Sequence, residues 1–427
     1  MHDTAELDAA PITADDELGA LGELTTGRPE PSSHRHPRRY RSDLLMRRLG
    51  HKPEHEAPRS GAGWLGRAAA LLAGVFLVGT AFIAAYVGAL HQPHPHAVPV
   101  GVASGDVGAQ ALLSAFGSTG TTSGGSPTEG TAPGGTIPST TALGGTLATK
   151  VYDTPADADR ALADRAVYAV LDTDPVADGL RLTVAGGAAP GVADLITQTV
   201  SAMAGGAHIP LSVRDAHPAA PRDPRGLTPF YLVVGWLLGG YLAATALAVI
   251  VGTVPRGMAR LGMRLGAFGA FAVLFGLAGA VLAGPVYGIW AGHFGALWLA
   301  GTLAVFSSAA VTAALESWVG LVGTGLAMLL LFILGNPGSG GVYPPEFLPG
   351  PFRDLHHWLP TGQATELVRA VEYFGAHATG QPIAGLLLWS LAGLVAVLGA
   401  TLALGHRHPP DPATPEPGAV PAEQPAG

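Results

Sequence analysis

Six stretches of this chain are apolar and long enough to cross the hydrocarbon core of a bilayer, which takes roughly 20 helical residues. Only 13% of the residues are charged, about half the share of a typical soluble protein. We therefore expect an α-helical integral membrane protein with six transmembrane helices, at Trp64 to Leu90, Pro229 to Val254, Leu265 to Leu282, Gly292 to Leu315, Trp318 to Leu334 and Ile383 to Leu404.

Positive charge predicts the orientation, because cytoplasmic flanks of membrane spans retain arginine and lysine. Nine such residues lie between Arg28 and Arg59, directly before the first span. With six crossings, the loop from Pro255 to Arg264 and the tail with Arg407 fall on the same side. We expect a multi-pass plasma membrane protein whose N- and C-termini are cytoplasmic.

The composition also divides the chain into regions. Residues 1–63 and 405–427 are polar and rich in proline, so we expect a disordered cytoplasmic N-terminal region and tail. Transmembrane helix 1 occupies 64–90, and the membrane domain with helices 2 to 6 occupies 229–404, with an extracytoplasmic loop at 335–382. The chain is rich in alanine, glycine and proline, which is typical of proteins encoded by GC-rich bacterial genomes.

Residues 91–228 are long enough for an extracytoplasmic domain between helices one and two. Strand-like and helix-like segments alternate there, which predicts an α/β domain. Thr154, Pro155 and Asp157 form a helix start with a capping box. In residues 117–145, 24 of 29 are Gly, Ser, Thr or Pro, and we expect a flexible linker. The strand segments are AVPVGVAS, TLATKVYD, VYAVLD and LRLTVAG, and the helical ones are DVGAQALLSAF, TPADADRALADRA and PGVADLITQTVSAMA.

Several kinds of chemistry have no sequence support. There is no nucleotide-binding GxxxxGK[ST] loop, no GxSxG nucleophile motif and no cysteine, so we expect neither an ATPase nor another enzyme, and no cofactor. The net charge of −8 without a global basic patch argues against nucleic acid. Histidines are common metal ligands, but the prolines among His91, His94 and His96 prevent helical ligand spacing there, so we assign no metal site. The candidate histidines are His91, His94, His96, His356, His357, His406 and His408.

The assigned span interiors hold no ionisable residue, which disfavours an ion-driven carrier, because such carriers keep charges along the ion path. Glu316 is expected to be a solvated residue in the turn between spans four and five. Any transport would then be powered by another polypeptide. Small residues such as Gly235 and Gly239 are compatible with close helix packing, or simply with a chain rich in glycine and alanine.

The segment after the fifth span reads GNPGSGGVYPPEFLPGPFRDLHHWLPTG, and its glycines and prolines exclude a continuous helix or strand. Followed by ATELVRAVEYF and a final span, it resembles the last extracytoplasmic segment of type-2 ABC exporter permeases, most closely the bacterial branch related to phage infection proteins. The segments VPVGVASGD, YDTPADADRALADRAVYAVLD and LITQTVSAM resemble the extracytoplasmic domain of that branch.

The resemblance implies a permease subunit that forms a homodimer or pairs with a similar subunit. A separate ATPase would dock on a cytoplasmic coupling loop, here Arg256, Arg260 and Arg264. We expect the segment with Pro344, Pro345, Glu346 and Trp358 to form an outer gate loop over the end of the bundle. Beyond it, Thr361 to Phe374 has an amphipathic pattern, and we expect it to lie on the outer membrane surface rather than to be re-entrant.

The sequence is compatible with two classes of function. The first is the permease subunit of an ATP-driven exporter, whose apolar path would suit lipids, hydrophobic drugs or an exported polymer. The second is a cell-surface membrane protein whose ectodomain binds an envelope component or a phage without transport. Loss of function on replacing the arginines of the coupling loop would favour the first class.

Overall fold

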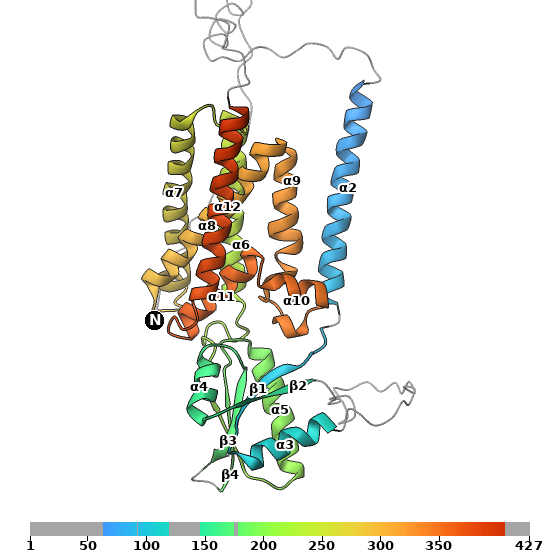
Figure 1. Cartoon of the computed structure of the whole chain (residues 1–427), viewed down its shortest axis with the longest axis vertical. Coiled ribbons are helices and arrows are strands. Elements are labelled where there is room, and N and C mark those ends of the chain that lie inside the picture. Colours follow the sequence, from blue (N-terminus) through green and yellow to red (C-terminus); the bar gives the residue numbers. More distant parts are fainter. Residues whose placement is uncertain (1–62, 92, 119–145, 175–177, 406–427) are drawn as a thin grey trace, which may run out of the picture. The chain divides into compact units, whose positions relative to one another are not determined.

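The computed structural model describes residues 63–91, 93–118, 146–174 and 178–405 (Figure 1). The predicted disordered N-terminal region and tail fall almost entirely outside these residues. Most of the predicted linker at 117–145 also lies outside them.

Within the described residues, five helices are long and apolar enough to cross a membrane (Figure 1). The chain is therefore that of a multi-pass membrane protein, as expected. The helices are α2 (Gly63–Leu90), α6 (Thr228–Val251), α7 (Met258–Val281, continued by the π-helical turn η2, Leu282–Val286), α8 (Phe294–Val319) and α12 (Gly380–Leu404).

The fifth predicted span, Trp318 to Leu334, is not supported as a full crossing. Trp318 belongs to α8, and Gly320, at φ +67°, turns the chain after that helix ends. The apolar residues that remain form α9 (Val322–Met328) and the π-helical η3 (Leu329–Leu334). At about 1.5 Å per residue, they extend roughly 20 Å, against about 30 Å for a hydrocarbon core.

Helix α8 lies at the centre of the bundle and packs against α6, α7 and α12. Glycines make this approach possible: a Cβ on Gly240 would collide with the backbone of α8 at Val305, and one on Gly393 with the backbone at Ala310. The pair singled out from the sequence is different, since Gly235 has open space beside it and Gly239 faces the Phe275 ring. Gly239 thus packs closely on α7 and Gly240 on α8, whereas Gly235 takes no part in close packing.

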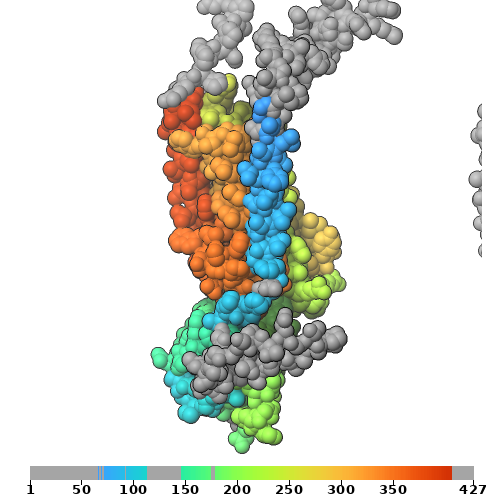
Figure 2. All heavy atoms as spheres, turned by 90° about the vertical axis from the view of Figure 1, so that its right-hand side faces the viewer, coloured from blue at the N-terminus to red at the C-terminus, as the bar shows by residue number. Residues whose placement is uncertain are grey.

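Helix α2 keeps most of its apolar side chains at the surface, where Figure 2 shows it as the blue helix. Phe76, for example, is 72% exposed. Near its C-terminal end, the Tyr86 hydroxyl accepts a hydrogen bond of 2.7 Å from the Asn336 amide. That bond connects the first span to the loop that follows η3.

The α/β domain has the elements that the sequence predicts, plus a fifth strand that it did not. The five strands form one sheet in the order β2-β1-β3-β4-β5, in which only β3 and β4 pair antiparallel. The elements are β1 (Val98–Ala103), α3 (Val107–Ser118), β2 (Leu147–Tyr152), α4 (Pro155–Ala163), β3 (Ala169–Asp174), β4 (Gly179–Val184), α5 (Pro190–Gly206) and the additional β5 (Leu211–Asp215).

The predicted start of α4 is confirmed in detail. The Thr154 side chain accepts a hydrogen bond from the backbone N–H of Asp157, and its hydroxyl donates to the Asp157 carboxylate at 2.7 Å. On one side of the sheet, α5 contributes Val192, Ile196 and Val200 to an apolar core. On the other side, α4 contributes its buried residues to a second core that also contains Phe374.

The loop between η3 and α12 contains short helical turns and one longer helix. After the turns η4 (Pro337–Ser339) and η5 (Pro345–Phe347) come α10 (Gly350–His356) and α11 (Pro360–Tyr373). The expected surface location of α11 is wrong, because nearly every residue from Pro360 to Val371 is buried and the helix packs against α6, α8 and α12. Protein, rather than a lipid surface, covers both its apolar and its charged faces.

Candidate functional site

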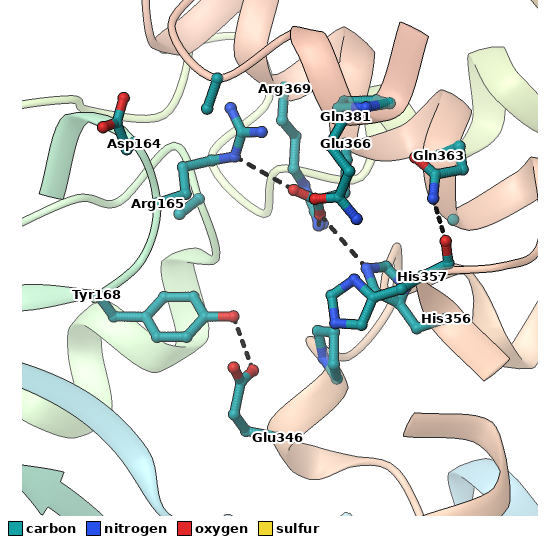
Figure 3. Close-up of a pocket in the computed structure, with 15 residues that line it drawn as sticks. Asp164, Arg165, Tyr168, Glu346, His356, His357, Gln363, Glu366, Arg369 and Gln381 are labelled. Carbon is teal, nitrogen blue, oxygen red and sulfur yellow. Dashed lines mark hydrogen bonds and ion pairs between the residues drawn. The ribbon is translucent and has the colours of Figure 1, made fainter. Parts of the chain in front are cut away.

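Several polar side chains converge where α11 meets the α/β domain (Figure 3). Glu366 of α11 is at the centre of this ion cluster. Its Oε2 accepts a hydrogen bond of 3.2 Å from Arg165 Nε, and its Oε1 lies 3.4 Å from Arg369 NH1. Arg165 follows α4 in the α/β domain, so the first bond joins two segments that are 201 residues apart in the sequence.

Charge explains why this carboxyl group can be buried. Burial by itself would raise the pKa of Glu366, but the positive charges of Arg165 and Arg369 lower its pKa to about 2. The carboxylate is therefore ionised at neutral pH. Removing any one of these charges would leave the others buried without full compensation, which is costly.

Arg369 and His356 also hold the glycine-rich loop that precedes α10. Arg369 NH1 donates to the Gly340 carbonyl at 2.9 Å, and its NH2 donates to the Gly341 carbonyl at 3.2 Å. The His356 Nδ1 lies 3.0 Å from the Gly338 carbonyl, which can only accept, so Nδ1 carries the proton. Burial lowers the pKa of His356, and its neutral form leaves Nε2 facing Glu366 at 3.9 Å.

Glu346, one of the residues predicted for the outer gate loop, forms a second connection to the α/β domain. Its carboxylate accepts a hydrogen bond of 2.7 Å from the Tyr168 hydroxyl, and its carbonyl accepts one of 2.9 Å from the His96 backbone N–H. Burial, followed by the charge of Glu346, raises the pKa of Tyr168 well above its usual range. Tyr168 therefore stays protonated and acts as a donor.

Apolar contacts complete this junction. Phe374, the residue after α11, is 1% exposed and belongs to the core that α4 covers. Its ring stacks on His217 at 4.5 Å between centroids, and the Arg165 guanidinium lies 5.4 Å from the same ring. Gly187 packs so closely on Tyr373 that a Cβ there would lie 2.7 Å from the Tyr373 Cβ. The end of α11 is thus held by both apolar and charged contacts.

A cavity of 160 Å³ opens beside the ion cluster and is lined by residues of both parts, including Arg165, Tyr168, Glu346 and Glu366. The described residues contain no group of three or more His, Cys, Asp or Glu side chains that could hold a metal ion. The charged groups are instead occupied with one another, as Figure 3 shows for Glu366 with Arg165. This geometry suits a mechanical connection between two parts of the chain.

The other residues of the predicted gate loop have different surroundings. Pro344 and Pro345 start the short turn η5, which positions Glu346. Trp358 is 71% exposed, and its carbonyl accepts a hydrogen bond of 2.7 Å from Trp389 of α12. Sequence reasoning missed the roles of Arg165, Tyr168 and Arg369. The only local signal was the charge pattern of Thr361 to Phe374, a helix expected to lie on the outer membrane surface, which contains Arg369 alone of the three.

The coupling loop is shorter than the predicted Pro255 to Arg264, because α7 already begins at Met258. Arg256 precedes this helix, and Arg256 and Arg260 are both exposed. Arg264 is 4% exposed, and its NH2 lies 3.7 Å from Glu316 Oε2. Its NH1 donates to the Gly252 and Thr253 carbonyls at 3.1 and 2.8 Å.

Glu316 is not a solvated turn residue, and the expectation of charge-free spans is wrong. It belongs to α8, its side chain is fully buried, and it accepts hydrogen bonds of 2.9 Å from Thr245 and Thr324. Opposite charges and hydroxyl donors make this burial possible, because they compensate for the lost hydration of the two ions. The membrane helices thus contain a second, internal ion pair.

No protein-family model, no curated protein and no solved structure matches this chain.

Proposed function

We propose that this chain is the permease subunit of an ATP-driven exporter in a bacterial plasma membrane. In this proposal the α/β domain is extracytoplasmic, both termini are cytoplasmic, and two permease subunits form the translocation path. A separate ATPase supplies the energy, and the substrate is hydrophobic or lipid-like. The described spans expose apolar side chains and carry few charges, which fits a substrate that moves along or between helices.

The junction at Glu366 is the observation that carries the proposal. An exporter has to link movement of its membrane helices to rearrangement of the domain outside the membrane. Helix α11 packs on α6, α8 and α12 and is fastened to the α/β domain through Arg165 and Phe374. A shift of the spans would therefore be transmitted to the domain, which a simple membrane anchor does not require.

The intramembrane pair of Arg264 and Glu316 does not by itself supply an ion path. Arg264 is held by two backbone carbonyls, and Glu316 by two threonine hydroxyls, so both groups have fixed structural partners. A carrier carboxylate has to exchange its proton or ion during transport. A separate ATPase remains the favoured energy source.

Affinity purification of the tagged chain from bacterial membranes, followed by reconstitution into proteoliposomes, tests the proposal. We expect a nucleotide-binding ATPase to co-purify and ATP to drive movement of a fluorescent phospholipid between leaflets. Repeated recovery without an ATPase, together with phospholipid movement that ATP depletion does not change, would refute it. Binding of an envelope component or a phage that survives Arg256→Gln/Arg260→Gln would favour the surface-recognition function instead.

The contact between Gly187 and Tyr373 allows a direct test of the junction. Because the natural chain contains no cysteine, the pair Gly187→Cys/Tyr373→Cys meets no other thiol within the chain, and an unchanged mass on a non-reducing gel excludes cross-links to another chain. A disulfide needs about 3.5–4.5 Å between Cβ atoms, so the two segments must separate by about 1 Å to form it. We expect oxidation to block transport by the double variant and a reductant to restore it, while oxidation leaves transport by the Tyr373→Cys single variant unchanged.

A further inference from the structure

A second cavity, of 460 Å³, lies at the turn between α6 and α7. It is lined by three arginines, Arg256, Arg260 and Arg264, and none of the described residues that line it is acidic. The rest of the lining is mostly apolar and includes Leu247, Val251, Met263 and Ala267. Pockets that bind small molecules have volumes of about 300–1,000 Å³, so this one is large enough for a ligand headgroup.

Arg264 shows that the positive charge in this cavity is only partly compensated. Its side chain is buried, and its Nε and NH2 have no hydrogen-bond partner among the described residues. Its nearest acidic group, Glu316, is 3.7 Å away and belongs to the interior of the bundle. One carboxylate against three guanidinium groups leaves two positive charges, and a buried guanidinium N–H without a partner calls for an acceptor.

The surroundings identify the kind of acceptor. Val249, Ile250 and Val251 at the end of α6, and Met258 and Met263 at the start of α7, are exposed apolar side chains that would contact acyl chains. Guanidinium groups bind phosphate oxygens through paired hydrogen bonds, and basic pockets between membrane helices bind anionic lipid headgroups. A ligand with a phosphate at one end and hydrocarbon at the other satisfies both parts of this site.

We propose that this cavity binds the phosphate headgroup of an anionic glycerophospholipid. The headgroup contacts Arg256, Arg260 and the Nε–H of Arg264, and the acyl chains lie along the exposed apolar residues of α6 and α7. The site requires only the chain itself, so it does not depend on the exporter function proposed above. Because cytoplasmic flanks of membrane spans retain positive charge, the arginines place the site, and so the lipid, at the cytoplasmic leaflet.

Binding is measured with the purified full chain in detergent micelles, titrated with phosphatidylglycerol and, separately, with phosphatidylcholine, using thermal unfolding as the readout. We expect saturable stabilisation by phosphatidylglycerol and little by phosphatidylcholine. Each arginine near a membrane surface contributes roughly fivefold to the affinity for anionic lipid, so Arg256→Gln/Arg260→Gln should weaken phosphatidylglycerol binding about thirtyfold. Both arginines are exposed, so the variant should fold normally.

The matched control is Arg214→Gln/Arg225→Gln, which removes the same charge from exposed positions that do not line the cavity. It should bind phosphatidylglycerol like the natural sequence. Equal weakening in both double variants, or none in the first, would overturn the proposal. Inorganic phosphate is titrated in parallel: if it stabilises the chain as strongly as phosphatidylglycerol at equal concentration, the site binds a free anion and the lipid assignment is wrong.

Discussion

Replacing Glu366 with glutamine tests whether the ion cluster holds α11 and the α/β domain together. Glutamine has nearly the same shape but no charge, so Arg165 and Arg369 lose their shared carboxylate. The pKa of Glu366 drops from 4.5 to about 2 in the folded chain. Because each tenfold change in acidity corresponds to about 1.4 kcal/mol, the surroundings favour the charged form by about 3 kcal/mol. We expect Glu366→Gln to lower the free energy of unfolding by a similar amount at pH 7.

The same shift predicts how this loss depends on pH. A carboxyl group whose folded-state pKa lies below its ordinary value stabilises the fold above that value and loses the effect as pH falls. The difference between natural sequence and variant should therefore be full above pH 4.5 and disappear as pH approaches 2. Detergent unfolding followed by tryptophan fluorescence, at several pH values, measures it.

A double-mutant cycle with Arg165→Ala serves as the control for Glu366→Gln. Because the two side chains are in direct contact, the double variant should lose less stability than the two single losses added together. The reasoning fails if Glu366→Gln unfolds within about 0.5 kcal/mol of the natural sequence at pH 7, the scatter expected for uncoupled surface changes.

Three further replacements test other parts of the fold. Burial raises the pKa of Glu372 to about 7, so ionisation of this group destabilises the fold as pH rises from 4.5 to 7. Glu372→Gln should therefore raise the free energy of unfolding by up to about 3 kcal/mol at pH 8 and leave it unchanged at pH 4, as measured by thermal unfolding. Gly240→Val should cost about 1–3 kcal/mol because α6 and α8 must separate, whereas Gly235→Ala, with open space beside it, should not destabilise in the same assay. Glu316→Ala should lower the free energy of unfolding by about 3–5 kcal/mol, because it leaves Arg264 buried and unpaired. The double variant Glu316→Leu/Arg264→Met should recover most of that loss, and a double variant no more stable than Glu316→Ala would contradict this.

Local patterns were sufficient to predict much of the architecture. Apolar runs located the five long helices, because a helix of about 20 apolar residues satisfies its own backbone and needs no partner to be recognised. The cap at Thr154 and the alternation of strands and helices in the α/β domain depend on neighbours a few residues apart. Strand β5 was missed because its short alternating segment, LSVRD, has few apolar residues.

The span boundaries show where such patterns fail. The predicted windows ended at a charged residue, whereas α7 and α8 extend past Arg264 and Glu316, whose opposite charges lie 3.7 Å apart. Composition along one segment cannot reveal a counter-charge supplied by another helix. The expectation that α11 lies at a surface was wrong for the same reason.

Which segments are helical, apolar or strand-forming is thus determined by the sequence itself, because those preferences are set within a turn or two of chain. The tertiary structure decides which charges are buried together. Arg165 and Glu366 are 201 residues apart, and their interaction exists only because the sheet domain and α11 meet in space. Coulomb energy depends on that distance and on the exclusion of water, neither of which is encoded in local sequence.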